Sequence, residues 1–227
     1  MGSDILPKHF NAAVLVCTKE PLKIFRVQLP NLKFGQVLVK INYSGVCRSQ
    51  LMEIDGERGE DRWLPHMLGH EGSGVVIKVG DGVKKVKIGD EVILTWIKGE
   101  GVEAKTPQSY YSNDIKINAG HVTTFSNYSV VSENRVAKKP VEMDPKVATL
   151  FGCALLTGGG MVVNQIQPNP GSKVIVFGLG GIGLSAISAL SDFSCDMICA
   201  VDISQSKLAL AKKLGASHII NSMECDL

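Results

Sequence analysis

A glycine-rich turn between an apolar run and a helix-forming segment places the strongest constraint on how this chain folds. Residues 173–177, Lys-Val-Ile-Val-Phe, predict a short strand of a parallel sheet, buried on both faces. The run Gly178-Leu-Gly-Gly-Ile-Gly183 follows, and residues 182–191 are expected to be helical. Strand, G-x-G-x-x-G and helix in this order form a dinucleotide-binding fingerprint. The expected contacts are Gly178, Leu179, Gly180, Gly181, Ile182 and Gly183.

Each glycine of this fingerprint has a physical reason. The first permits the tight turn, and the second lets the backbone approach a pyrophosphate group. The third lets the helix pack closely on the strand, and the free N–H groups at the helix start favour the phosphate charge. A βαβ turn without a ligand is the alternative. The complete order of strand, glycines, helix and acidic residue favours dinucleotide binding.

The acidic residue lies at the end of the next predicted strand and bears on the choice of dinucleotide. Strand 195–201 ends in Asp202, 19 residues after Gly183, where the ribose hydroxyls are expected. A carboxylate accepts hydrogen bonds from a ribose diol and repels a 2′-phosphate, so we expect NAD rather than NADP. Lys207 is a candidate second contact to the ribose, and an exposed helix lysine is the alternative.

The chain changes character near residue 152, which predicts two domains. Before it, β-rich runs at 37–41, 74–79 and 91–95 are bounded by turn residues and predict a mostly antiparallel β domain. The polar, glycine-spotted stretch 98–120 predicts a long surface excursion. After residue 173 the order is β-α-β-α-β. Its last elements are a helix over 205–214, closed by Gly215, and a strand over 218–220.

Composition and charge exclude several partners. A net charge of +2 over 227 residues gives no reason to expect nucleic acid. Residues 174–191 carry no charge over 18 residues, but their four glycines argue against a membrane helix. The six cysteines are scattered and the first ten residues lack a signal-peptide core, so we expect reduced thiols and a cytoplasmic location.

Cys47, His70 and Cys153 form a candidate metal set, although they lie far apart in sequence. Each has glycine and polar neighbours, and two thiolates with one imidazole suit zinc. Three protein ligands leave a fourth position for water or substrate, as in catalytic sites. From spacing alone, two core cysteines and a hydrogen-bonded histidine remain the favoured interpretation.

Three motifs in order give a family resemblance. Gly69-His-Glu-Gly-Ser-Gly74, followed by Gly80 and Val83, resembles the zinc-type signature of the medium-chain alcohol dehydrogenases. Gly45-Val-Cys-Arg-Ser49 and Gly152-Cys-Ala-Leu-Leu-Thr-Gly158 resemble the segments that carry the first and third zinc ligands of that family. The dinucleotide fingerprint and Asp202 fall where the family binds NAD. The chain thus resembles the amino-terminal part of such an enzyme.

The resemblance implies a fold and an activity. The fold is a chaperonin-10-like (GroES-like) β domain over residues 1–154, followed by a partial Rossmann domain over 155–227. The activity is oxidation of a primary or secondary alcohol to an aldehyde or ketone, with hydride passing to NAD. The substrate is therefore a small molecule, and the parent enzyme is expected to be a homo-oligomer.

The resemblance also implies residue roles. Cys47, His70 and Cys153 would hold one catalytic zinc, with Glu71 behind it as an alternative ligand. Ser49 would take the hydroxyl proton of the alcohol. Trp96 stands at an aromatic wall of the substrate pocket. Arg48 and a turn at Thr157 and Gly158 would lie near the pyrophosphate or nicotinamide.

The sequence departs from the family in four ways. Residues 97–152 contain no cysteine, so a structural zinc held by four cysteines is not expected. Gln50 replaces the aspartate that commonly orients the ligand histidine, although its amide oxygen could still accept from the imidazole. Met52 replaces a histidine that ends the proton relay in some members, so the proton would leave another way, for example through ribose hydroxyls. The second half of the Rossmann sheet is missing, so the chain is expected to be truncated and, by itself, inactive.

Two other functions stay open at this point. One is a zinc-free quinone or enone reductase of the same superfamily, against which the cysteine and histidine set argues. The other is a non-catalytic zinc- or nucleotide-binding remnant, which the missing half would favour.

Overall fold

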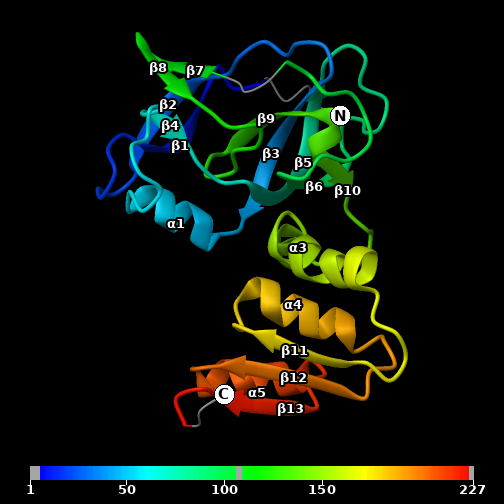
Figure 1. Cartoon of the computed structure of the whole chain (residues 1–227). Helices are drawn as coiled ribbons and strands as arrows, with labels where there is room; N and C mark the ends of the chain where they lie inside the picture. Colours follow the sequence, from blue (N-terminus) through cyan, green and yellow to red (C-terminus); the bar gives the residue numbers. More distant parts are fainter. Residues whose placement is uncertain (1–5, 106–108, 225–227) are drawn as a thin grey trace. The chain divides into compact units, whose positions relative to one another are not determined.

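The computed structural model describes residues 6–105 and 109–224, which form two compact units, Met1–Cys153 and Ala154–Leu227. We call them the N-terminal and C-terminal units and describe each by itself (Figure 1).

Two five-stranded sheets make up most of the N-terminal unit. The first has the order β2-β1-β4-β8-β7 and the second β10-β6-β5-β3-β9. Described pairs are antiparallel, except β4 with β8, which pair in parallel through His66 and Asn118. The strands are β1 (His9–Leu15), β2 (Lys23–Gln28), β3 (Gln36–Ser44), β4 (His66–Met67), β5 (Glu71–Val79), β6 (Glu91–Thr95), β7 (Ser109–Ser112), β8 (Ile115–Asn118), β9 (Tyr128–Ser132) and β10 (Val136–Lys138).

Alternation of apolar and polar residues explains how these strands face their cores. In β1, Phe10, Ala12 and Val14 are buried, whereas His9 and Asn11 are exposed, as the period of two in a strand requires. One apolar cluster collects valines of β3, β5, β6, β9 and β10, and another collects Phe10, Tyr110 and Ile117. Short helices α1 (Arg48–Ile54) and η1 (Glu133–Arg135) lie between strands, and α2 (Pro145–Leu150) follows the last strand of this unit.

The C-terminal unit contains the predicted β-α-β-α-β order. Strands β11 (Lys173–Phe177), β12 (Met197–Asp202) and β13 (His218–Asn221) pair in parallel and in this order. Helices α4 (Gly181–Leu190) and α5 (Gln205–Lys213) connect them, and α3 (Ala154–Met161) with the π-turn η2 (Val162–Ile166) precedes them. Buried Leu179, Ile187, Leu190 and Leu208 form the core.

Three sequence-based expectations are wrong in detail. The stretch 98–120 is not a plain excursion, because β7 and β8 form a hairpin within it. Thr157 and Gly158 lie inside helix α3 rather than in a turn. Strand β11 is partly buried on one face only, with Ile175 52% and Phe177 67% exposed on the other.

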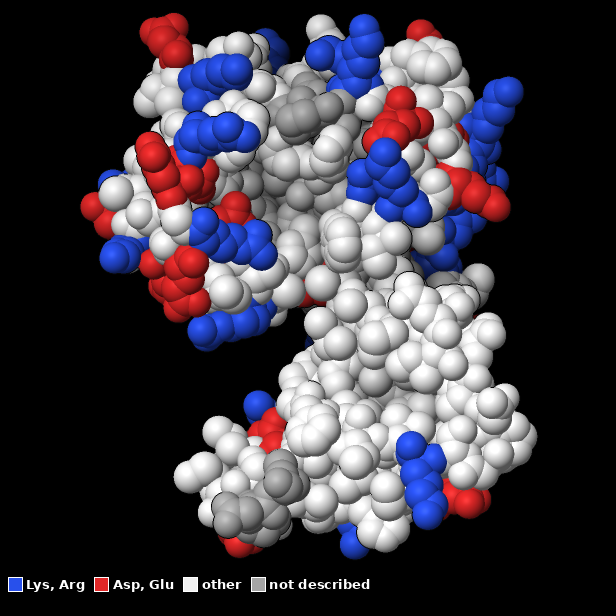
Figure 2. Space-filling model, viewed as in Figure 1, with Lys and Arg blue, Asp and Glu red and all other residues white. Residues whose placement is uncertain are grey.

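The exposed face of β11 has a simple physical origin. Val174 and Val176 point to the core, and side chains alternate along a strand, so Ile175 and Phe177 must point the other way. No described layer covers them there. The visible surface of the C-terminal unit in Figure 2 is accordingly mostly uncharged, whereas charged side chains are frequent on the N-terminal unit.

None of the helices in the described ranges combines the length and apolar character needed to cross a bilayer.

Candidate active site

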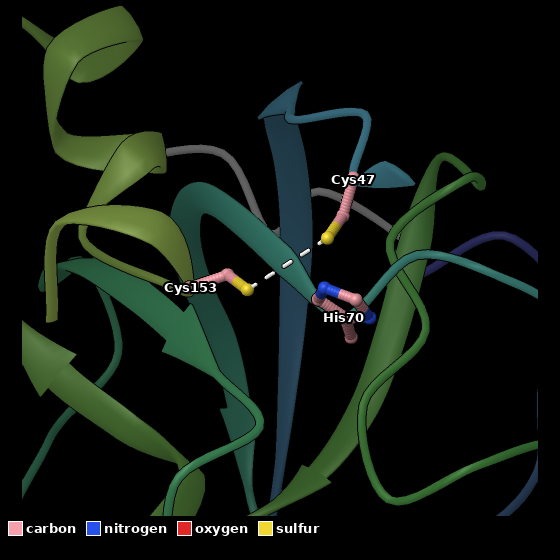
Figure 3. Close-up of side chains that lie close together, drawn as sticks. All are labelled: Cys47, His70 and Cys153. Atoms are coloured by element: carbon pink, nitrogen blue, oxygen red, sulfur yellow. Dashed lines mark hydrogen bonds between the residues drawn. The ribbon is translucent and has the colours of Figure 1, made fainter. Parts of the chain in front are cut away.

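The three sequence-predicted metal ligands come together in the N-terminal unit. Cys47 follows β3 at the start of α1, His70 directly precedes β5, and Cys153 follows α2. Their ligand atoms all lie within 4.8 Å of one another, and the two Sγ atoms are 3.9 Å apart. Figure 3 shows both sulfur atoms and the imidazole ring of His70 facing a common point. All three side chains are buried or half-buried.

Two glycines near the ligands, Gly45 and Gly152, allow this convergence because their backbone packs directly on Glu71. A Cβ atom at Gly45 would lie 2.6 Å from the Cδ atom of Glu71, and one at Gly152 would lie 2.6 Å from its Cβ atom. At Gly152 the same atom would also lie 2.5 Å from the carbonyl oxygen of Leu94. Separations this short exclude any side chain. The glycines beside Cys47 and Cys153 therefore serve close packing around one buried carboxyl group.

The electrostatics of the cluster call for a cation. Burial, then the neighbouring Cys47 thiol and Glu71 carboxylate, raise the pKa of Cys153 to about 12. Burial, then Arg58, lowers the pKa of His70 and so favours its neutral, ligating form. The buried Nε2 atom of His70 has no hydrogen-bond partner in the described structure. A divalent ion would stabilise both thiolates and satisfy this nitrogen, so the residues fit zinc.

Glu71 lies in β5 beside this cluster but outside the group of three ligand atoms. Its side chain is 3% exposed, and burial raises the pKa of its carboxyl group. Its Oε2 atom also has no hydrogen-bond partner within the described residues. This position of Glu71 agrees with the place behind the metal that the family resemblance implies. The role of Glu71 as an alternative ligand stays a prediction.

Three further residues with implied roles lie around the N-terminal cluster. Ser49 Oγ donates a hydrogen bond of 3.2 Å to the Cys47 sulfur, which places this hydroxyl beside a ligand atom. Arg48 is largely exposed, with its guanidinium nitrogen 3.8 Å from Glu57. Trp96 directly follows β6 and is 48% exposed.

Gln50 does not orient His70 as the sequence suggested. Both the Gln50 Oε1 atom and the His70 Nε2 atom are buried without a partner among the described residues. Both side chains instead line one cavity of about 300 Å³. A glutamine reaches one methylene further from the helix than an aspartate, so its carbonyl need not fall where a shorter acid would contact the ring.

The predicted dinucleotide loop joins β11 to α4 in the C-terminal unit. Gly178 has φ +83°, in the left-handed region that favours glycine. A Cβ atom at Gly183 would overlap the carbonyl oxygen of Gly178, so only glycine allows this helix to start so close to the strand. At Gly178 and Gly180, by contrast, a Cβ atom would meet no atom within 4 Å. No side chain caps the start of α4, so its N–H groups can receive a phosphate group.

The acidic residue after β12 holds this loop in place. Asp202 accepts a hydrogen bond of 2.6 Å from the Leu179 N–H and one of 2.8 Å from the Ser204 N–H. These hydrogen bonds lower its pKa, so the carboxylate stays charged. Lys207 lies 3.9 Å away on α5 and is half exposed. Thr157 lies on α3 directly before Gly158, which packs closely against Ile182 and Ser185 of α4. The ribose contacts of Asp202 and Lys207 stay predictions.

Sequence reasoning missed a second polar cluster formed by Glu53, Asp61 and His66, whose ligand atoms also lie within 4.8 Å of one another. Glu53 is on α1, Asp61 in the loop that follows, and His66 on β4. Their spacing matches no motif. The only available signal was a histidine in an apolar run, four residues before His70.

Comparisons with known proteins agree with this arrangement. Residues 33–141 match the family model described as the alcohol dehydrogenase GroES-like domain. The S-(hydroxymethyl)glutathione dehydrogenase of Synechocystis sp. is 34% identical over 95% of this chain and 64% of the relative. The class-3 alcohol dehydrogenase of Cereibacter sphaeroides is 35% identical over the same shares of the two chains.

Solved structures give the same result for the fold. An alcohol dehydrogenase zinc-binding domain protein from Burkholderia ambifaria aligns with a TM-score of 0.87 and 31% identity, over 96% of this chain and 65% of that one. A benzyl alcohol dehydrogenase from Acinetobacter calcoaceticus aligns with a TM-score of 0.84 and 28% identity, over 97% of this chain and 66% of that one.

Over nearly its whole length, the chain is similar to curated alcohol dehydrogenases and to a solved alcohol dehydrogenase zinc-binding domain protein. It has a GroES-like domain, followed by a three-stranded unit of the Rossmann type. The sequence spans 64% of the length of the curated relatives named above.

Proposed function

We propose that the protein carrying this sequence is a zinc- and NAD-dependent dehydrogenase of small primary or secondary alcohols. One observation carries the proposal. Two thiols and an imidazole converge within 4.8 Å in a chain that also folds a glycine-rich loop suited to a dinucleotide. When bound, zinc supplies Lewis-acid polarisation of the substrate oxygen, and NAD supplies the hydride acceptor.

The residues of the chain divide the remaining work. Cys47, His70 and Cys153 hold the ion, and Ser49, beside the Cys47 sulfur, takes the hydroxyl proton of the alcohol. Glu71 supports the ligands from behind, with the option of ligation. The reverse reaction uses the same groups. Ser49 would then return a proton to the substrate oxygen as an aldehyde or ketone is reduced.

In the C-terminal unit, the backbone of 178–183 receives the pyrophosphate, and Asp202 accepts from the ribose hydroxyls. Arg48 and Thr157 assist at the pyrophosphate or nicotinamide, and Lys207 assists at the ribose. The charge of Asp202 is maintained by two backbone N–H groups, which supports NAD over NADP because a 2′-phosphate would be repelled.

Metal content and location complete the proposal. The cysteine site takes a single catalytic zinc, and no four-cysteine structural zinc is expected because residues 97–152 lack cysteine. The described cysteines form no disulfide bond, which suits a cytoplasmic protein. Assembly into a homo-oligomer is proposed on the family resemblance alone.

The test is NADH formation by the native protein that carries this sequence, with a panel of primary and secondary alcohols. We expect turnover with NAD well above that with NADP, loss of turnover after chelation, and recovery with added zinc. A chelated enzyme that keeps its activity would favour the zinc-free reductase. A zinc-loaded protein that turns over none of the panel would favour the non-catalytic remnant.

A further inference from the structure

The cluster of Glu53, Asp61 and His66 is tightly built and largely withdrawn from solvent. His66 Nε2 lies 2.7 Å from Asp61 Oδ2 and 3.8 Å from Glu53 Oε1. The side chains of His66 and Asp61 are only 8% and 11% exposed, and that of Glu53 is 30% exposed. Two carboxylates with one imidazole in such a place need a compensating positive charge, because unpaired buried charges are costly.

The orientation of His66 indicates where that charge belongs. Its Nδ1 atom lies 3.2 Å from the carbonyl oxygen of Met67. A carbonyl oxygen can only accept, so Nδ1 carries the hydrogen and donates it. The Nε2 atom then faces two carboxylate oxygens, and either a proton or a metal ion must stand between them. Metal-ligating histidines commonly have this arrangement, with the second nitrogen bound to a backbone carbonyl.

The adjoining cavity supplies the second, independent observation. His66 and Glu53 line the cavity of about 300 Å³, which has room for several waters at about 30 Å³ each. Gln50 lines the same cavity, is 4% exposed, and has an Oε1 atom without a partner among the described residues. A buried amide oxygen left unsatisfied costs free energy, so this acceptor indicates a donor such as a water molecule bound to an ion.

We propose that Glu53, Asp61 and His66 bind a divalent cation of the zinc and cobalt type, with open coordination positions toward this cavity. One imidazole and two carboxylates are ligands that zinc accepts. Two ligand atoms about 2.1 Å from a tetrahedral ion lie about 3.4 Å apart. The observed separations of 2.7 Å and 3.8 Å bracket that value. These ligands differ from Cys47, His70 and Cys153, so this site can be tested independently of the proposed dehydrogenase.

The experiment counts bound cobalt and zinc in the full chain, dialysed against a metal buffer, by elemental analysis and absorption. Wild type is expected to bind two ions. His66→Gln should lose one ion and keep the thiolate-to-cobalt absorption of the cysteine site. The double variant Cys47→Ala/Cys153→Ala should keep one ion without that absorption. His218→Gln, which alters an exposed histidine of the C-terminal unit, is the matched control and should keep both ions.

Several outcomes would overturn the site. They are a single cobalt ion in wild type that shows the thiolate absorption, two ions retained in His66→Gln, or no ion in the double cysteine variant. If His66→Gln does not fold, Glu53→Gln replaces the most exposed ligand and should weaken the second cobalt at least tenfold. Unchanged affinity there would mean that the second cobalt binds elsewhere and would overturn the site, leaving a proton between His66 and the carboxylates. Absence of the thiolate absorption with one ion still bound at His66 would instead contradict the proposed dehydrogenase.

Discussion

The metal cluster and the dinucleotide loop are built in opposite ways. The loop is contiguous, since the three residues between β11 and α4 and the first three residues of α4 provide the turn, the open helix start and the close helix packing. The metal cluster is assembled from three segments that are far apart in sequence and meet around buried Glu71. A contiguous site depends on local backbone conformation, whereas an assembled site depends on the packing of the whole N-terminal unit.

This difference has an electrostatic counterpart. In the loop, a carboxylate is held charged by backbone N–H groups, which lower the pKa of Asp202. In the metal cluster, burial raises the pKa values of Glu71 and Cys153, so the ionised forms depend on a partner. The loop is therefore organised without its ligand, and the cluster gains its stable charge state only with a cation.

The largest expected effect comes from removing one metal ligand. Cys47→Ala should abolish the thiolate-to-cobalt absorption of the cysteine site and lower turnover of the native enzyme by orders of magnitude, because the ion loses one of three protein ligands. Cys17→Ala, which alters an exposed free cysteine, should change neither. An undiminished absorption in Cys47→Ala would contradict the assigned ligand set.

Substitutions at two glycines of the loop should distinguish an effect on folding from an effect on NAD binding. Gly183→Ala should unfold or strongly destabilise the C-terminal unit, because its Cβ atom would overlap the Gly178 carbonyl oxygen. Gly180→Ala meets no atom within 4 Å and should fold normally, yet bind NAD at least tenfold more weakly because its methyl group occupies space meant for the pyrophosphate. Thermal unfolding and NAD titration measure the two effects. Equal NAD affinity in Gly180→Ala and wild type would mean that the pyrophosphate does not bind at this loop.

From residue 173 onward, the sequence predicted the strands and helices of the C-terminal unit closely, but it did not predict helix α3 (Ala154–Met161) or η2 (Val162–Ile166). The strand over 173–177 and the helix begun near residue 182 were expected because local periodicity and glycine punctuation carry that information. The exposure of Ile175 and Phe177 was not predicted. An apolar run reports that both faces can be buried, and cannot report which other segments cover them.

The N-terminal site was predictable only through family resemblance. Nothing local links Cys47 to Cys153, so spacing favoured a structural interpretation, and only the order of glycine-flanked motifs indicated a metal. Glu53, Asp61 and His66 were missed for the same reason, since a helix, a loop and a strand contribute one side chain each. The hairpin of β7 and β8 was missed because its short strands lie in a polar stretch.

The smallest effect concerns the charge of Asp202 and its dependence on pH. Asp202→Asn keeps one acceptor oxygen but turns an N–H donor toward the Leu179 or Ser204 N–H, so it should destabilise the C-terminal unit by about 1–3 kcal/mol. Loss of the charge should also narrow the preference of the native enzyme for NAD over NADP. Asp192→Asn, which alters an exposed residue of the same unit, is the control and should change neither property.

The pH dependence tests whether the charge itself is responsible. Because the folded-state pKa of Asp202 lies below its ordinary value of 3.8, the carboxylate contributes its full stability above that value. The contribution is lost as the pH falls through the lower, folded-state pKa. The difference in unfolding free energy between wild type and Asp202→Asn should thus be constant from about pH 5 to 8 and narrow below about pH 4. Urea unfolding over this range measures it. A difference that persists unchanged into acid would mean that the shape of the side chain, rather than its charge, holds the loop.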